Sequence, residues 1–337
     1  ATAVETVTGT ATQMDALLLV EGSTGDKVNL DADYNITISG SNATVTQANA
    51  YGTATDGVVT ATISDQNIAT LDDLTTGSAD QLTITVATTS VTASALTTVA
   101  GATGLNVTAT AVETVTGTAT QMDALLAVEG STGDKVNLDA DYAITINSGT
   151  ATVTQANAYA TAAGVVTATI SDTDIATLDD LTTASTDQLT ITVASTSATA
   201  AQLKTVGDAT GLNVTATAVE SVTNSSVAQV KALLTDEGST GDKVNLDGDF
   251  TVAINDTGTV DAADLNTINA ATTGLVTATG VATINGTASA ITTLIGNEGT
   301  SGDKVALDTD FAMTVSSGSA TVDQANTMAA FSTSGAI

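Results

Sequence analysis

The chain is built from internal repeats. Residues 1–18, ATAVETVTGTATQMDALL, recur unchanged at residues 109–126, and a diverged copy begins at Ala216, so the long period is about 107–108 residues. Self-similarity at a fixed period indicates a repeat architecture, in which each unit packs on its two neighbours. The sequence therefore predicts a single continuous solenoid over residues 1–337, and we expect it to be part of a longer array of the same repeats.

Shorter units lie within the long period and share a pattern rather than a sequence. Their expected starts are Lys27, Val58, Leu82, Leu105, Lys135, Val165, Leu189, Leu212, Lys243, Leu275 and Lys304. With a partial unit before them, they predict about twelve coils of 23–32 residues, most of which end in Gly or Gly-Asp. The third long repeat passes directly from the coil at Lys243 to the coil at Leu275. A solenoid tolerates the loss of whole coils because each coil contacts only its neighbours.

Each unit opens with alternating side chains. Val59, Ala61 and Ile63 are apolar, and the residues between them are Thr. A period of two predicts a half-buried strand, and Val, Ile and Thr are residues that suit strands.

Each unit then changes to a helical period. Met14, Leu17 and Leu18 fall on one face of a predicted helix, and Thr10 with Gln13 has the spacing of a capping box.

A second type of helix is expected around Ile68, Leu71 and Leu74, which also share one face. Ser64 or Asp65 is its expected N-cap.

Strand, turn and helix in each unit predict an α/β fold, a solenoid of about twelve strand-turn-helix coils with a parallel β-sheet face. An all-β helix is the alternative, and the helix caps weigh against it.

The residue types that are missing restrict the chemistry. The chain has no His and no Cys, its six basic residues are all Lys, and its formal net charge is −31. Without these side chains a catalytic base, a thiolate nucleophile or a Cys-ligated metal has few candidates, so we expect no enzyme activity. The negative charge argues against nucleic acid, whose phosphates need Lys and Arg clusters, and no apolar run is long enough to predict membrane insertion.

A tentative calcium site is predicted at the motif GDKVNLDADY of residues 25–34. It recurs at residues 133–142, as GDKVNLDGDF at 241–250 and as GDKVALDTDF at 302–311. Carboxylates on an outward strand face and in the preceding turn are hard oxygen ligands of the kind that Ca²⁺ prefers. The candidate ligands are Asp26, Asp31, Asp33, Asp134, Asp139, Asp141, Asp242, Asp247, Asp249, Asp303, Asp308 and Asp310.

The alternative is that Lys27 pairs locally with Asp31 or Asp33 and the acids keep the surface soluble. The aromatic residue that ends each motif is expected to fill the core.

Outward threonines form a second candidate site, a binding face. They are Thr60, Thr62, Thr83, Thr85, Thr108 and Thr110, in pairs on three successive coils. A flat array of ranked Thr residues is what ice-binding solenoids use, although Thr is also an ordinary surface residue of strands.

The phrases VTATAVETVTGTATQMDALL at residues 107–126 and DTDIATLDDLTT at 172–183 carry a resemblance. They resemble the Thr/Ala/Val-rich repeat segments of giant secreted surface or S-layer-like proteins of bacteria, cyanobacteria especially. The resemblance implies an extracellular, cell-surface, structural role that is often associated with calcium.

These observations together predict a non-catalytic extracellular structural repeat protein that forms a surface layer, stalk or filament. The alternative is an adhesin or ice-binding module that presents its Thr-x-Thr, Asn and Asp strand faces; a polysaccharide-acting enzyme is a third, weaker hypothesis. The expected partners are copies of the chain itself or adjoining repeats, because exposed strand edges pair readily. Apart from Ca²⁺, no cofactor is expected.

Overall fold

The structure is a computed structural model that describes residues 4–21, 28–129, 135–235 and 243–331. It divides into two compact units, Ala1–Ala151 with Ala158–Ala168, and Thr152–Asn157 with Thr169–Ile337. Each unit is described by itself. Asp26, Asp134 and Asp242 of the predicted calcium sites lie outside the described residues.

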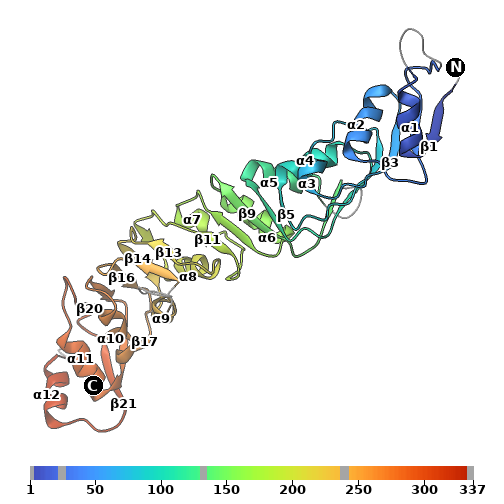
Figure 1. The fold of residues 1–337 in the computed structure, drawn as a ribbon. Helices are drawn as coiled ribbons and strands as arrows, with labels where there is room; N and C mark the ends of the chain where they lie inside the picture. Colours follow the sequence, from blue (N-terminus) through green and yellow to red (C-terminus); the bar gives the residue numbers. More distant parts are fainter. Residues whose placement is uncertain (1–3, 22–27, 130–134, 236–242, 332–337) are drawn as a thin grey trace. The chain divides into compact units, whose positions relative to one another are not determined.

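The first unit alternates strands and helices along the chain (Figure 1). Its strands are β1 (Thr6–Gly9), β2 (Asn35–Ile38), β3 (Val59–Thr62), β4 (Gln81–Thr83), β5 (Ser90–Thr92), β6 (Val107–Ala109), β7 (Thr114–Thr118), β8 (Val136–Leu138), β9 (Ala143–Ser148) and most of β10 (Val166–Thr169). Its helices are α1 (Ala11–Leu18), α2 (Val45–Ala54), α3 (Ile68–Leu71), α4 (Ala93–Gly101) and α5 (Ala119–Leu126), and α6 (Val153–Ala162) spans the division between the units.

The second unit continues the same alternation. Its strands are β11 (Gln188–Thr190), β12 (Ser197–Ala198), β13 (Val214–Ala216), β14 (Ser221–Ser225), β15 (Val244–Leu246), β16 (Thr251–Ile254), β17 (Thr259–Asp261), β18 (Val276–Ala278), β19 (Thr283–Thr287), β20 (Val305–Leu307) and β21 (Ala312–Ser317). Its helices are α7 (Ile175–Leu178), α8 (Ala200–Asp208), α9 (Val227–Leu234), α10 (Ala262–Ala270), α11 (Ala288–Gly296) and α12 (Val322–Phe331).

Strands of successive coils pair in parallel. In the first unit the orders are β1-β2-β3-β4, β10-β9-β7-β5 and β6-β8, and in the second they are β12-β14-β16-β18-β20, β13-β15 and β17-β19-β21. Parallel neighbours need a crossover, and here the helix of each coil supplies it. The predicted α/β fold of repeated strand-helix units is therefore confirmed. The alternative of an all-β helix is wrong, because the described residues contain twelve helices.

The core follows the alternation in the sequence. Val59, Ala61 and Ile63 are buried, whereas Thr60 and Thr62 between them are exposed. The aromatic residues that end the four GDKV motifs are buried as expected; they are Tyr34, Tyr142, Phe250 and Phe311. A thin core of aliphatic side chains thus runs through consecutive coils of each unit.

The first copy of the GDKV strand differs from its repeats. Residues 136–138 form β8, which pairs with β6 of the preceding coil. In the first copy Val28 forms only an isolated bridge with Glu21. The physical reason is that a strand needs a partner, and no strand equivalent to β6 precedes Val28 among the described residues.

One predicted capping box is confirmed and one predicted N-cap is wrong. The side chain of Thr10 accepts from the backbone N–H of Gln13, and the Gln13 side chain accepts in return from the N–H of Thr10. Helix α3 instead begins after Asn67, whose side chain accepts from the N–H of Ala69. Asp65, proposed as that cap, accepts at 2.8 Å from the first N–H of helix α2 in the preceding coil. A carboxylate is attracted there because the first N–H groups of a helix have no partner within it and carry positive charge.

Candidate functional site

The aspartates after each GDKV strand are all exposed. Those that the structure describes are Asp31, Asp33, Asp139, Asp141, Asp247, Asp249, Asp308 and Asp310. The first aspartate of each pair accepts a hydrogen bond from the next backbone N–H, at 2.7–3.0 Å. These local bonds hold the turn and leave the other carboxylate oxygens toward solvent.

One copy of this turn faces an acid of the preceding coil. Asp247 and Asp249 line the same hollow as Glu220 and Thr251. Asp303 accepts from the side-chain amide of Asn269 at 3.2 Å. Among the residues that the structure describes, no group of three acidic, His or Cys side chains is close enough to hold a metal ion. Calcium binding at these turns stays a prediction.

Two lysines of the motif bond to residues that lie just before the start of the preceding coil. Lys135 donates to the carbonyl of Thr103 at 3.1 Å, and Lys243 pairs with Asp208 at 3.5 Å. Lys27, which we expected to pair with Asp31 or Asp33, lies outside the described residues.

The threonine face is exposed, in a register different from the expected ranks. Thr62 lies beside Thr83, and Thr60 lies beside Gln81. Thr85 lies beside Thr108, while Thr110 follows β6 in a turn. The observed strand pairing is shifted by two residues from the pairing in which Thr60 would lie beside Thr83. A shift of two residues keeps every side chain on the same face of the sheet. Alternation alone therefore predicts the face and leaves the register open.

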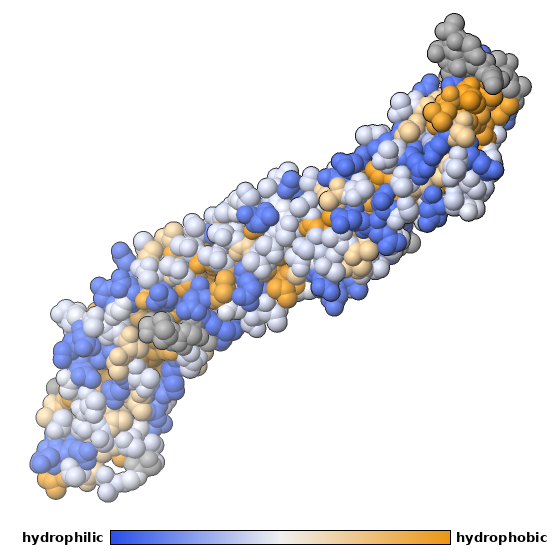
Figure 2. All heavy atoms as spheres, in the orientation of Figure 1, coloured by the Kyte–Doolittle hydropathy of each residue, from blue (hydrophilic) through white to orange (hydrophobic). Residues whose placement is uncertain are grey.

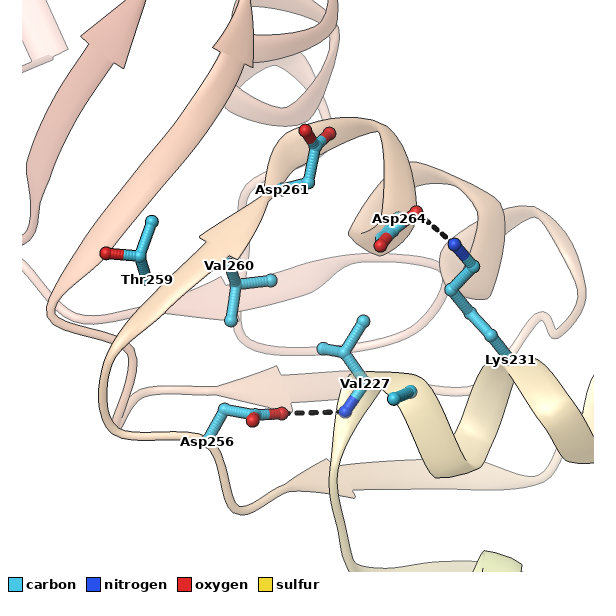
Figure 3. Close-up of a pocket in the computed structure, with 8 residues that line it drawn as sticks. Val227, Lys231, Asp256, Thr259, Val260, Asp261 and Asp264 are labelled. Atoms are coloured by element: carbon cyan, nitrogen blue, oxygen red, sulfur yellow. Dashed lines mark hydrogen bonds and ion pairs between the residues drawn. The ribbon is translucent and has the colours of Figure 1, made fainter. Parts of the chain in front are cut away.

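A hollow between α9 and α10 brings together charged residues that the sequence gave no reason to group (Figure 3). Lys231 forms an ion pair with Asp264. Asp256 accepts from the first N–H of α9, at Val227, over 2.7 Å, and Asp261 is the N-cap of α10. The ion pair of Lys231 with Asp264 and the bond from Val227 to Asp256 thus attach one coil to the next, whereas Asp261 caps its own helix.

Buried threonines at the ends of coils form a third group, which sequence reasoning missed. Thr103 accepts from the N–H groups of Leu82, at 3.0 Å, and Leu105, at 3.1 Å, and donates to the carbonyl of Leu82 at 2.8 Å. It thereby joins the start of one coil to the strand of the coil before. The equivalent buried threonines are Thr55, Thr210 and Thr272. The sequence signal that could have found them is a Thr one or two residues before the Gly that ends a coil.

First N–H groups of the helices are bonded across coils as well. Val45 donates to Asp65, Val153 donates to Asp172, and Val227 donates to Asp256. Shorter polar side chains do the same for other helices, as when Ala200 donates to Ser225 at 2.9 Å. Polar side chains of one coil therefore complete the helix of its neighbour.

The fold and its contacts define an α/β repeat protein whose coils are bonded to one another by backbone ladders and buried polar groups. No known protein family, curated protein or solved structure matches the chain. None of the helices in the described ranges combines the length and the apolar character needed to cross a membrane.

Proposed function

We propose that the chain is a non-catalytic extracellular structural repeat protein that forms a surface layer, stalk or filament at the cell surface. The observation that carries the proposal is polar bonding between coils: the buried Thr103 and its equivalents, and half-buried acids that bond to neighbouring helices, join one coil to the next. Such bonding resists separation of the coils, which is the property that a load-bearing or covering element needs.

Antibody labelling of intact producing cells, followed by electron microscopy, tests this proposal. We expect label over a continuous layer or over fibres on unpermeabilised cells. Label that is reached only after permeabilisation would refute the extracellular role. The formal charge of −31 supports the accompanying proposal that nucleic acid is not a partner, since phosphates would be repelled.

Calcium binding at the GDKV turns is proposed as part of this role. The supporting observation is that Asp247 and Asp249 are exposed on one turn, where their carboxylates are open to a cation from solvent. We expect Ca²⁺ to raise the melting temperature, and Asp247→Asn with Asp249→Asn to reduce that rise. The matched control is Asp72→Asn with Asp73→Asn, which removes the same charge from an exposed site elsewhere. If Ca²⁺ raised the melting temperature of both variants equally, calcium binding at these turns would be refuted.

A second candidate function is an adhesin or ice-binding module. The exposed neighbours Thr62 and Thr83, and Thr85 and Thr108, favour it. Thermal hysteresis of the purified chain, lost on Thr62→Lys and Thr83→Lys, would support ice binding. Thermal hysteresis no larger than that of an unrelated protein of the same charge would exclude ice binding.

A further inference from the structure

The turn that follows the GDKV strand occurs four times, and in one copy the residue after the first aspartate is Gly. In each copy the carboxylate of the first aspartate accepts a hydrogen bond from the N–H of the next residue, at 2.7–3.0 Å. That next residue is Ala32, Ala140 or Thr309 in three copies and Gly248 in the other. The pair Asp247-Gly248 is therefore the same turn without a Cβ on its second residue.

The backbone nitrogen of Gly248 lies beside the carboxyl carbon of Asp247. It donates to the Oδ1 of Asp247 over 2.8 Å, and Oδ1 is bonded directly to that carbon. Atoms that react with each other need to be held about 3–3.5 Å apart, and this hydrogen bond keeps nitrogen and carbon close. Both residues are exposed, and hydrophilic side chains cover much of the surface seen in Figure 2, so water reaches the turn. A Cβ on Gly248 would meet nothing within 4 Å, so the backbone has room to rotate.

The fold holds the other two glycines that directly follow Asp or Asn in the sequence. The N–H of Gly57 donates to the hydroxyl of Thr55 at 2.9 Å, and a Cβ on Gly57 would lie 2.4 Å from the carbonyl oxygen of Tyr34. Gly286 is buried within β19 and lies beside Val315 of β21. Each of these nitrogens has to leave its contacts before it can approach the preceding side chain, whereas that of Gly248 is already in place.

We propose that Asp247-Gly248 is a site of spontaneous covalent modification, at which Asp247 converts to isoaspartate. The Gly248 nitrogen bonds to Cγ of the protonated carboxyl group, and its amide proton leaves with the carboxyl hydroxyl as water. The product is a five-membered succinimide ring. Water then opens the ring at either carbonyl, which restores aspartate or leaves the chain running through the side-chain carbon as isoaspartate. No electrons are transferred, and the mass of the final product equals that of the original chain.

The modification falls beside a contact that closes the coil. The carbonyl of Gly248 accepts from the N–H of Thr273 at 2.9 Å and from the hydroxyl of Thr272 at 3.4 Å, and these bonds join the start of the coil to its end. Isoaspartate adds one carbon to the backbone immediately before Gly248. The added length displaces this carbonyl, so we expect the modified chain to melt at a lower temperature.

Peptide mapping of the folded chain, incubated at physiological temperature and pH, tests the proposal. Fragmentation by electron transfer distinguishes isoaspartate from aspartate of the same mass. We expect isoaspartate at residue 247 to accumulate at least about fivefold faster than at Asp139, in the equivalent turn, or at Asp56, in the other Asp-Gly pair. In concentrated urea the rates at residues 247 and 56 should agree within about twofold, because unfolding releases both glycines. Equal rates at these two residues in the folded chain would overturn the inference.

The variant Gly248→Ala separates the chemistry from the fold. It gives this turn the residue that its copies carry at Ala32 and Ala140, and the added Cβ meets no neighbour. We expect its initial melting temperature to equal that of the original chain and its isoaspartate to form at least about fivefold more slowly. During incubation the melting temperature should fall with the isoaspartate content of the original chain and stay constant in the variant. A variant that reacts as fast as the original chain, or full conversion without a lower melting temperature, would contradict the inference.

Discussion

Two kinds of buried tyrosine differ only in what surrounds the hydroxyl. The Tyr159 hydroxyl donates to Asp123 at 2.8 Å and lies 3.0 Å from the carbonyl of Ala119. The Tyr142 hydroxyl is buried without a hydrogen-bond partner among the described residues, and the repeats of this position carry Phe250 and Phe311.

This contrast predicts opposite effects for the same substitution. Tyr142→Phe should leave the free energy of unfolding unchanged or raise it by about 1 kcal/mol, because it removes an unpaired buried hydroxyl. Tyr159→Phe should lower it by about 1–3 kcal/mol, since a hydrogen bond to a carboxylate is lost. Urea unfolding of the two variants measures both effects. A larger loss for Tyr142→Phe than for Tyr159→Phe would contradict the assignment.

The same tyrosines predict a loss of stability in alkali. Burial raises the pKa of Tyr34, Tyr51, Tyr142 and Tyr159 above the ordinary value of 10.0, and at Tyr159 the hydrogen bond to Asp123 adds to the effect. The unfolded chain therefore releases phenolic protons at a lower pH than the folded chain does. The stabilising contribution is complete below about pH 10 and is lost as the pH rises further. The urea midpoint should fall steeply between about pH 10 and 12, and less steeply in Tyr142→Phe. An unchanged slope in that variant would show that Tyr142 does not contribute to the fall.

At the scale of the element, the buried threonines connect each coil to the one before. Thr103→Val keeps the shape of the side chain but leaves the N–H groups of Leu82 and Leu105 without their acceptor. We expect it to lower the free energy of unfolding by about 2–4 kcal/mol. Thr83→Val, at an exposed strand position, should change it by less than about 0.5 kcal/mol. Equal losses in urea unfolding would show that the bonds of Thr103 do not hold the coils.

The glycines that end coils are required by a close approach between the end of a coil and the backbone near its start. A Cβ at Gly274 would lie 2.3 Å from the carbonyl oxygen of Phe250, whereas a Cβ at Gly248 would meet nothing within 4 Å. Gly274→Ala should therefore lower the free energy of unfolding by about 1–3 kcal/mol, because the two backbones must separate. Gly248→Ala is the matched control and should be close to neutral. Similar melting temperatures for the two variants would contradict this explanation.

At the scale of the whole molecule, stacking predicts that complete coils can be removed. Deleting residues 58–104 joins Gly57 to Leu105, as Gly274 is joined to Leu275 in the third long repeat. We expect a folded chain with an unchanged helix and strand signal per residue, because each coil depends mainly on its neighbours. Deleting only residues 58–69 should unfold the adjoining coils, since it breaks one coil and displaces the next. Circular dichroism and thermal melting distinguish these outcomes, and loss of structure in the whole-coil deletion would refute nearest-neighbour stacking.

The sequence alone determined the kind of fold and the buried face of each strand. Alternation at Val59, Ala61 and Ile63, and the capping box of Thr10 and Gln13, report local geometry that any three-dimensional arrangement must satisfy. The burial of the aromatic residue that ends each GDKV motif was predictable for the same reason.

Only the tertiary structure decided which coil contacts which side chain. Asp65 lies next to its own helix in sequence but bonds to Val45 of the preceding coil, because that helix end offers an unpaired N–H. Thr60 lies beside Gln81 rather than Thr83, since a displacement of two residues preserves the alternation and costs no burial. Periodicity fixes the face on which a side chain lies, whereas its neighbour across the sheet depends on how two coils meet.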